Sequence, residues 1–149
     1  MAPNRDWLEW LSSLNAQGAE DVVVGGVALA HPGAPRYTGD LDVLIAATPK
    51  NADRVLRALR DFGFEGLKIG VEDLSVADRV VQIGFPPGRI DLLTSIDGAE
   101  WREVDATAET GRYGTVPVRY ISRELLIRNK RASGRSQGRA DAERLEAGS

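Results

Sequence analysis

Two aspartates stand two residues apart in the apolar run "DLDVLI" (residues 40–45), and they constrain the fold more than any other feature. Successive side chains of a β-strand point to opposite faces, so Asp40 and Asp42 share one face with Leu44. The opposite face is apolar throughout, with Leu41, Val43 and Ile45. Like charges that are half-buried side by side are unfavourable unless something neutralises them. The pattern therefore predicts a strand that packs under helices on one face and carries an acidic site on the other; an edge strand with solvated acids is the alternative.

A second strand, "RIDLL" (residues 89–93), repeats this pattern. Asp91 shares a face with Arg89 and Leu93, opposite Ile90 and Leu92. If the two strands are neighbours, Asp91 stands beside Asp40 and Asp42. Three carboxylates on one sheet face can hold two Mg²⁺ or Mn²⁺ ions and with them a phosphate-bearing substrate. A salt bridge between Asp91 and Arg89 is the alternative.

A glycine pair, Gly25 and Gly26, follows the apolar strand "DVVV", and thirteen residues separate it from the start of the acidic run at Asp40. Glycine allows a tight turn and a close backbone approach, and the short helix expected after it has free N–H groups for an anion. A triphosphate could lie there with its metal ions on the aspartates; a purely structural turn is the alternative. Arg36 and Thr38, in the loop that enters the acidic strand, are further candidate contacts for the nucleotide, and an exposed Arg36 is again the alternative.

The remaining pattern predicts a mixed sheet with helices packed on it, an α/β or α+β fold in a single domain over residues 1–149. The core is expected at about residues 20–121, preceded by a helix over residues 5–17. A second helix is expected from Pro49 to Phe62, a hairpin around "PPG" (residues 86–88), and a short helix over residues 98–107. Residues 114–121 predict a strand that Pro117 restricts to an edge. A C-terminal helical segment follows over about residues 122–146, with Ser122 as the first N-cap.

Composition narrows the classes of protein. The chain has no Cys and one His, which excludes disulfides and zinc sites built from Cys or several His. No apolar run approaches the ~20 residues of a membrane span, so we expect a cytoplasmic protein without membrane contact. The net charge is −3, but residues 119–149 carry eight Lys and Arg against four Asp and Glu. Such a basic tail could meet an anion such as RNA, and a solvated helix face is the alternative.

Together, Gly25-Gly26, "DLD" and "RIDLL" resemble the nucleotidyltransferase superfamily named after DNA polymerase β. The longer stretches "VVGGVALAHPGAPRYTGDLDVLI", "GRIDLLTSIDG" and "LLIRNKRASGRSQGRADAERL" are similar to small stand-alone bacterial nucleotidyltransferase-like proteins. Those proteins are related to abortive-infection nucleotidyltransferase toxins and to the minimal nucleotidyltransferases. The resemblance covers about residues 20–145. It departs from the family's "GRxxDxxD" pattern at Gly138, where members often carry an acid.

This resemblance implies a polymerase-β-like fold and a set of roles. Gly25 and Gly26 would hold the nucleotide phosphates, and Asp40, Asp42 and Asp91 would bind the metal ions. Asp91 would also act as the base or orienter for the attacking hydroxyl. Lys130, on the C-terminal helix, would face the triphosphate.

The expected function is Mg²⁺-dependent transfer of NMP from an NTP, such as ATP, to a hydroxyl. The acceptor could be a protein side chain, a tRNA end or a small molecule, and a partner protein or a homodimer could supply its binding surface. The resemblance also implies that the protein could act in a toxin–antitoxin or phage-defence system. A non-catalytic nucleotide- or partner-binding module that keeps the fold is the alternative, and an RNA-binding protein that uses the basic tail is a weaker one.

Overall fold

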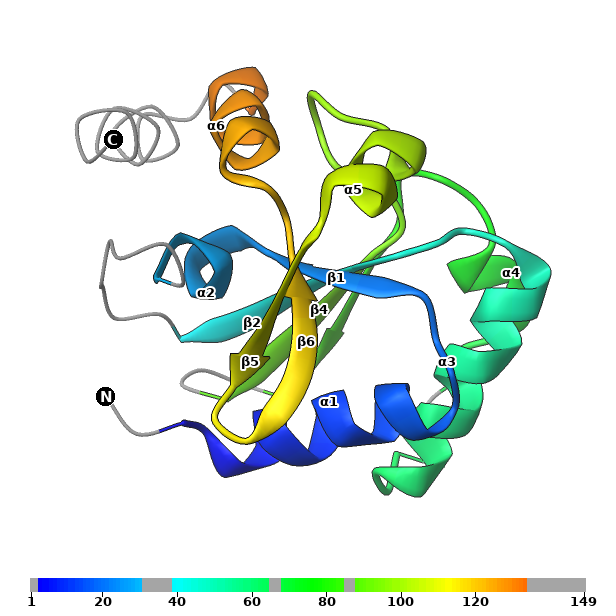
Figure 1. The fold of residues 1–149 in the computed structure, drawn as a ribbon. Coiled ribbons are helices and arrows are strands. Elements are labelled where there is room, and N and C mark those ends of the chain that lie inside the picture. The colour runs from blue at the N-terminus through cyan, green and yellow to red at the C-terminus, as the bar shows by residue number, and fades with distance from the viewer. Residues whose placement is uncertain (1–2, 31–38, 65–67, 85–87, 134–149) are drawn as a thin grey trace.

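The computed structural model describes residues 3–30, 39–64, 68–84 and 88–133 (Figure 1). In these ranges the chain forms six helices and six strands. The helices are α1 (Arg5–Ala16), α2 (Gly25–Ala30), α3 (Pro49–Asp61), α4 (Val71–Leu74), α5 (Trp101–Thr107) and α6 (Arg123–Ala132). The strands are β1 (Asp21–Val24), β2 (Asp40–Ile45), β3 (Val80–Ile83), β4 (Arg89–Leu93), β5 (Glu109–Tyr113) and β6 (Val116–Tyr120).

All six strands belong to one mixed sheet in the order β3-β4-β2-β1-β6-β5. β2 runs parallel to β4 and β1 runs parallel to β6. The pairs β1–β2, β3–β4 and β5–β6 are antiparallel. The fold class is therefore α+β with a mixed sheet, which confirms the predicted class at this level.

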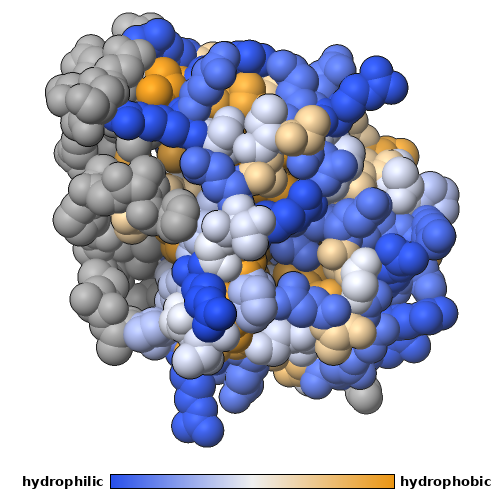
Figure 2. Space-filling view, viewed as in Figure 1, coloured by the Kyte–Doolittle hydropathy of each residue, from blue (hydrophilic) through white to orange (hydrophobic). Residues whose placement is uncertain are grey.

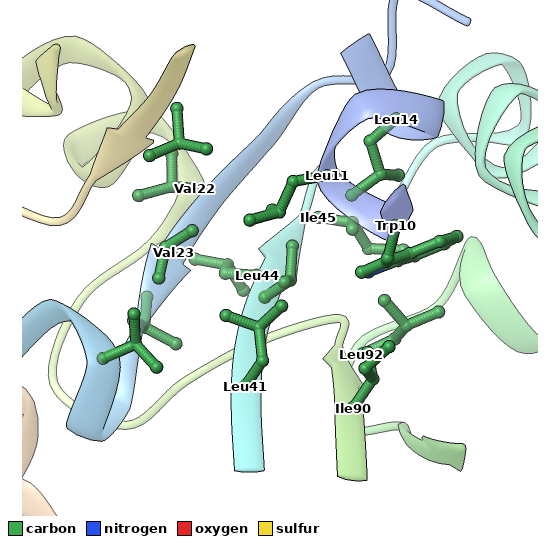
Figure 3. Packing of buried hydrophobic residues seen from close by; sticks show 14 of the residues in the cluster. Trp10, Leu11, Leu14, Val22, Val23, Leu41, Leu44, Ile45, Ile90 and Leu92 are labelled. Atoms are coloured by element: carbon green, nitrogen blue, oxygen red, sulfur yellow. The ribbon is translucent and has the colours of Figure 1, made fainter. Parts of the chain in front are cut away.

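Helices cover both faces of the sheet: Figure 1 shows α1 and α3 on one side and α2, α5 and α6 toward the other. Trp10, Leu11 and Leu14 of α1 lie over the apolar faces of β2 and β4 (Figure 3), and each is at most 1% exposed. Burying a side chain of this size contributes about 1.5–3 kcal/mol. The predicted apolar faces of the two acidic strands therefore form the core. On the face of the molecule drawn in Figure 2, the described residues are mainly hydrophilic.

The first two long helices begin and end close to the predicted positions. The Asn4 side chain accepts hydrogen bonds from the backbone N–H groups of Asp6 and Trp7 at 2.9 and 3.1 Å, which satisfies the first turn of α1. Thr48 caps α3 in the same way, and Pro49 takes its first position. Ser122, the predicted N-cap of α6, accepts a hydrogen bond from the backbone N–H of Leu125.

Several expected details of the fold are wrong. Pro117 is not on an edge, because β6 lies between β1 and β5. The missing N–H of Pro117 is tolerated there since β1 reaches β6 only at Tyr120, so the β1 side of Pro117 is unpaired within the described sheet. The outer strand, β5, and the single-turn helix α4 were not predicted, and α2 begins at Gly25 rather than after the glycine pair.

Two expectations fall partly or wholly outside the described residues. β3 and β4 pair as the predicted hairpin requires, but residues 86 and 87 of its turn are not among the described ones. The predicted C-terminal helical segment, at about residues 122–146, is described only as far as residue 133, and the rest of it lies outside the described residues. Across the described ranges, no helix is both long enough and apolar enough to pass through a bilayer.

Asp21, at the start of β1, is buried, and burial raises its pKa from 3.8 to about 7 even though Arg119 opposes the shift. The folded state therefore binds this proton more tightly than the unfolded chain, so folding stability should fall as pH rises between these two values. We expect Asp21→Asn to reduce this slope, which is at most about 1.4 kcal/mol per pH unit for one group. Urea unfolding from about pH 4 to about pH 8 measures it.

Asp105→Asn is the matched control, because Asp105 is an exposed partner of the same arginine at 2.8 Å. The pH dependence of folding stability in Asp105→Asn should equal that of the wild type. If Asp21→Asn also left that slope intact, the buried carboxyl of Asp21 would not be its source.

Candidate functional site

The three predicted acids meet on one face of the sheet because β2 and β4 are parallel neighbours. Asp42 pairs in register with Asp91, and Asp40 pairs with Arg89. The carboxylates of Asp40, Asp42 and Asp91 each offer an oxygen, and these oxygens lie within 4.8 Å of one another. The two acidic strands are therefore neighbours, which is the condition under which the sequence places Asp91 beside Asp40 and Asp42.

Ionisation of Asp42 is opposed by its surroundings. Burial, and after it the neighbouring charges of Asp40 and Asp91, raise the pKa of Asp42 to about 7. A hydrogen bond with Asp91 acts in the same direction, whereas Lys130 opposes it. Burial also raises the pKa of Asp91, against the attraction of Arg89. The cluster thus attracts positive charge.

Arg89 contacts two of these acids. Its Nη2 lies 3.2 Å from Asp40 Oδ2 and 3.2 Å from Asp91 Oδ2, and its Nε lies 3.1 Å from Asp91 Oδ1. The Nε and Oδ1 atoms are buried and close, yet they are not aligned as a hydrogen bond. The salt bridge between Asp91 and Arg89, which was the alternative interpretation of Asp91, is therefore present together with the acid cluster.

Gly25 leaves the space that Asp42 occupies. It is buried with a φ of +69°, a conformation that costs a side-chain-bearing residue roughly 1–2 kcal/mol. A Cβ at Gly25 would lie 3.0 Å from Asp42 Cγ and would overlap Asp42 Oδ2. The first glycine of the pair is thus required by the position of the carboxylate, a role that spacing alone did not reveal. Gly26 follows in the first turn of α2.

A pocket of about 510 Å³ adjoins the cluster, and Asp42 and Gly25 line it. Lys130 lines it from α6, and Arg79 and Val80 line it from the start of β3. Its volume lies within the range of small-ligand sites, roughly 300–1,000 Å³. A ligand in this pocket would therefore touch Asp42 and Lys130 at once.

Polar contacts fix α6, and with it Lys130, over the end of β4. Asn129 Nδ2 donates to the backbone oxygen of Asp97 at 2.9 Å. Arg128 Nη1 donates to the backbone oxygen of Gly98 at 3.3 Å and to Glu103 Oε2 at 2.8 Å. The helix is thereby tied to the segment between β4 and α5, whose Ser95, Ile96 and Asp97 also line the pocket.

Most of the predicted site residues converge. Asp40, Asp42, Asp91, Gly25 and Lys130 lie in or beside the cluster and its pocket. Arg36 and Thr38 lie outside the described residues, as do the residues around Gly138. Sequence reasoning missed the pocket-lining segment Asp78–Val80. The predicted hairpin could have indicated this segment. Its two strands pair Val80 with Leu93, which brings Asp78–Val80 beside the acidic strand β4.

The donor set fits a hard divalent cation. Three carboxylates supply the oxygen ligands that Mg²⁺ and Mn²⁺ prefer. Asp91 is only 7% exposed, and its Oδ1 lies 3.1 Å from Arg89 Nε but accepts no hydrogen bond from the described residues. Buried oxygens of this kind are normally satisfied by a partner, and an ion would supply one here.

In comparisons with known proteins, no protein-family model matches the chain and no curated protein matches it. The functional argument therefore rests on the geometry of the acid cluster and its pocket.

Replacing Gly25 by Ala tests the contact between Gly25 and Asp42. We expect Gly25→Ala to lower the free energy of unfolding by at least about 1 kcal/mol more than Gly18→Ala does, because overpacking typically costs about 1–3 kcal/mol. Gly18 is the matched control, since its φ is +66° but nothing lies within 4 Å of its added Cβ. Urea unfolding of both variants measures the difference. Equal losses would mean that Asp42 does not depend on the glycine.

Proposed function

We propose that this chain is a Mg²⁺-dependent nucleotidyltransferase that moves NMP from an NTP to a hydroxyl group and releases pyrophosphate. The observation that carries the proposal is the convergence of three carboxylates from two neighbouring parallel strands at a pocket that Lys130 also lines. In phosphoryl and nucleotidyl transfers the protein mainly positions the reactants and stabilises the charge of the transition state, and it seldom forms covalent bonds itself. Both the positioning and the charge stabilisation can be supplied by this arrangement.

Asp40, Asp42 and Asp91 would hold the divalent ions, one or two in number. When bound, such ions neutralise phosphate charge and favour ionisation of a bound hydroxyl. In the reaction, the acceptor oxygen forms a bond to the α-phosphorus while the bond from that phosphorus to the bridging oxygen of pyrophosphate breaks. Asp91 would take the hydroxyl proton or orient the hydroxyl. The pyrophosphate leaves with the bridging oxygen and its electron pair.

Two cationic side chains and the glycine pair support the proposal that a triphosphate binds here. Lys130 lowers the pKa of Asp42 through its positive charge, so it stands near enough to act on an anion bound at the same place. Arg79 lines the same pocket and adds a second cation. Gly25 and Gly26, at the start of α2, would allow the phosphates to approach the backbone.

The finer fold is part of the proposal. A glycine pair after an apolar residue, then two acids on either side of an apolar residue, then a third acid on a later strand, is the order that the resemblance to the polymerase-β-like nucleotidyltransferases implies. β1, α2, β2 and β4 follow this order. The acceptor remains a protein side chain, a tRNA end or a small molecule, with a partner protein or a second copy as the source of additional surface. A place in a toxin–antitoxin or phage-defence system belongs to the same proposal.

A non-catalytic nucleotide- or partner-binding module is the competing proposal. The ion pairs of Arg89 favour it, because they neutralise two of the three acids without any metal ion. The two proposals differ in whether the α-phosphate of an NTP is transferred.

Thermal unfolding with ATP, GTP, CTP or UTP, each with and without Mg²⁺, tests the binding site. We expect at least one NTP to stabilise the wild type only when Mg²⁺ is present. At a ligand concentration 100-fold above its dissociation constant the gain is about 2.7 kcal/mol, or roughly 5–10 °C. Asp42→Asn should abolish this gain. Without ligand, above about pH 7, the same variant should unfold about 2–4 °C higher because one like charge is removed.

Asp53→Asn is the matched control, since Asp53 is an exposed aspartate of α3 paired with Arg57. It should keep the Mg²⁺-dependent gain. Absence of any gain with all four NTPs would contradict the proposal. Transfer of label from the α-phosphate to added tRNA or protein, lost in Asp42→Asn, would separate the enzyme from the binding module.

A further inference from the structure

Arg89 occupies oxygens that a metal ion in the acid cluster would need. Its guanidinium is within 3.2 Å of both oxygens of Asp91 and of Asp40 Oδ2. Asp42 is not among the acids that it contacts at these distances. A divalent ion that binds to Asp40 and Asp91 must therefore share or take these oxygens from the arginine.

The backbone register fixes this position of Arg89. It precedes Asp91 by two residues on β4, so both side chains lie on the same face. It also pairs in register with Asp40 on β2. The side chain is 30% exposed, which leaves it room to move out toward solvent. The arginine is therefore built into the cluster and can also leave it.

The contacts of Arg89 are of a kind that a divalent ion can replace. Charge-assisted hydrogen bonds between nitrogen and oxygen are typically about 2.7–2.9 Å long. Those of Arg89 measure 3.2 Å, and the closest pair, Nε and Asp91 Oδ1 at 3.1 Å, is not aligned as a hydrogen bond. The guanidinium keeps its charge at any ordinary pH, so it neutralises the acids without satisfying them fully.

We propose that Arg89 is the resident cation of the site, and that divalent ions bind tightly only when it is displaced from Asp40 and Asp91. This inference rests on the metal site of the proposed function and adds a form of regulation to it. Without nucleotide, Arg89 holds the acids together and keeps the affinity for a free metal ion low. A triphosphate brings its own charge and accompanies the metal ion, and the displaced guanidinium can pair with a phosphate oxygen. The site is then loaded by the metal–nucleotide complex rather than by the metal ion alone.

Binding of Mn²⁺ without nucleotide, followed by electron paramagnetic resonance of the free ion, tests the inference. We expect Arg89→Gln to bind Mn²⁺ about tenfold more tightly than the wild type, or better, because the competing cation is gone. Metal-free Arg89→Gln should unfold at a lower temperature than the wild type, and Mn²⁺ should restore it. Arg57→Gln is the matched control, since Arg57 forms a surface ion pair with Asp53. It should bind Mn²⁺ as the wild type does.

Arg89→Lys keeps the experiment decisive if Arg89→Gln does not fold. A lysine keeps one positive charge but cannot span two carboxylates as the planar guanidinium does, so it should also bind Mn²⁺ more tightly than the wild type. Equal or weaker binding by the folded Arg89 variants, with measurable binding in the wild type, would overturn this inference and leave the metal site intact. No binding by the wild type or by any Arg89 variant would overturn the inference together with the proposed metal site.

Discussion

The structure depends on the parallel pairing of β2 with β4, which sets Asp42 directly beside Asp91. Two carboxylates in register repel each other. Two cations offset this repulsion, because Arg89 contacts Asp91 and the positive charge of Lys130 acts on Asp42. The first residue of α2 is a glycine because a side chain there would overlap Asp42. The acid cluster is thus the cause of several local features, and a shift of one residue in the pairing would remove all of them.

The same pairing also holds the core together. Because side chains alternate along a strand, the residues between the acids point into the apolar layer under α1 (Figure 3). Leu41, Ile90 and Leu92 are at most 2% exposed, so neither strand can slide without bringing a charge into the core. The cost of burying an unpaired charge is far larger than the repulsion within the cluster. The packing on one face therefore fixes the geometry of the acids on the other.

The sequence predicted the faces of the two acidic strands because the period of a strand is fixed at two residues. It predicted that these strands could be neighbours but not that they run parallel, since strand order depends on contacts far apart in the chain. β5 was missed because its side chains are exposed or half-buried and "ETGRY" has no apolar alternation. The salt bridge between Arg89 and Asp91 was open as an alternative, because the two residues share a strand face. The contact of Arg89 with Asp40 and the pocket around Asp78–Val80 come from pairings between strands, which residue spacing does not contain. Arg36 and Thr38 stay predictions, because they lie outside the described residues.

The most direct test of the central claim is a crystal structure grown with Mn²⁺ and a non-hydrolysable NTP, with the metal located by its anomalous scattering. The account predicts a metal peak at bonding distance from carboxylate oxygens of at least two of Asp40, Asp42 and Asp91, with the triphosphate in the adjoining pocket. Arg89 should then have left the oxygens it contacts here. A nucleotide bound elsewhere, or three acids that still hold Arg89 with no metal among them, would contradict it.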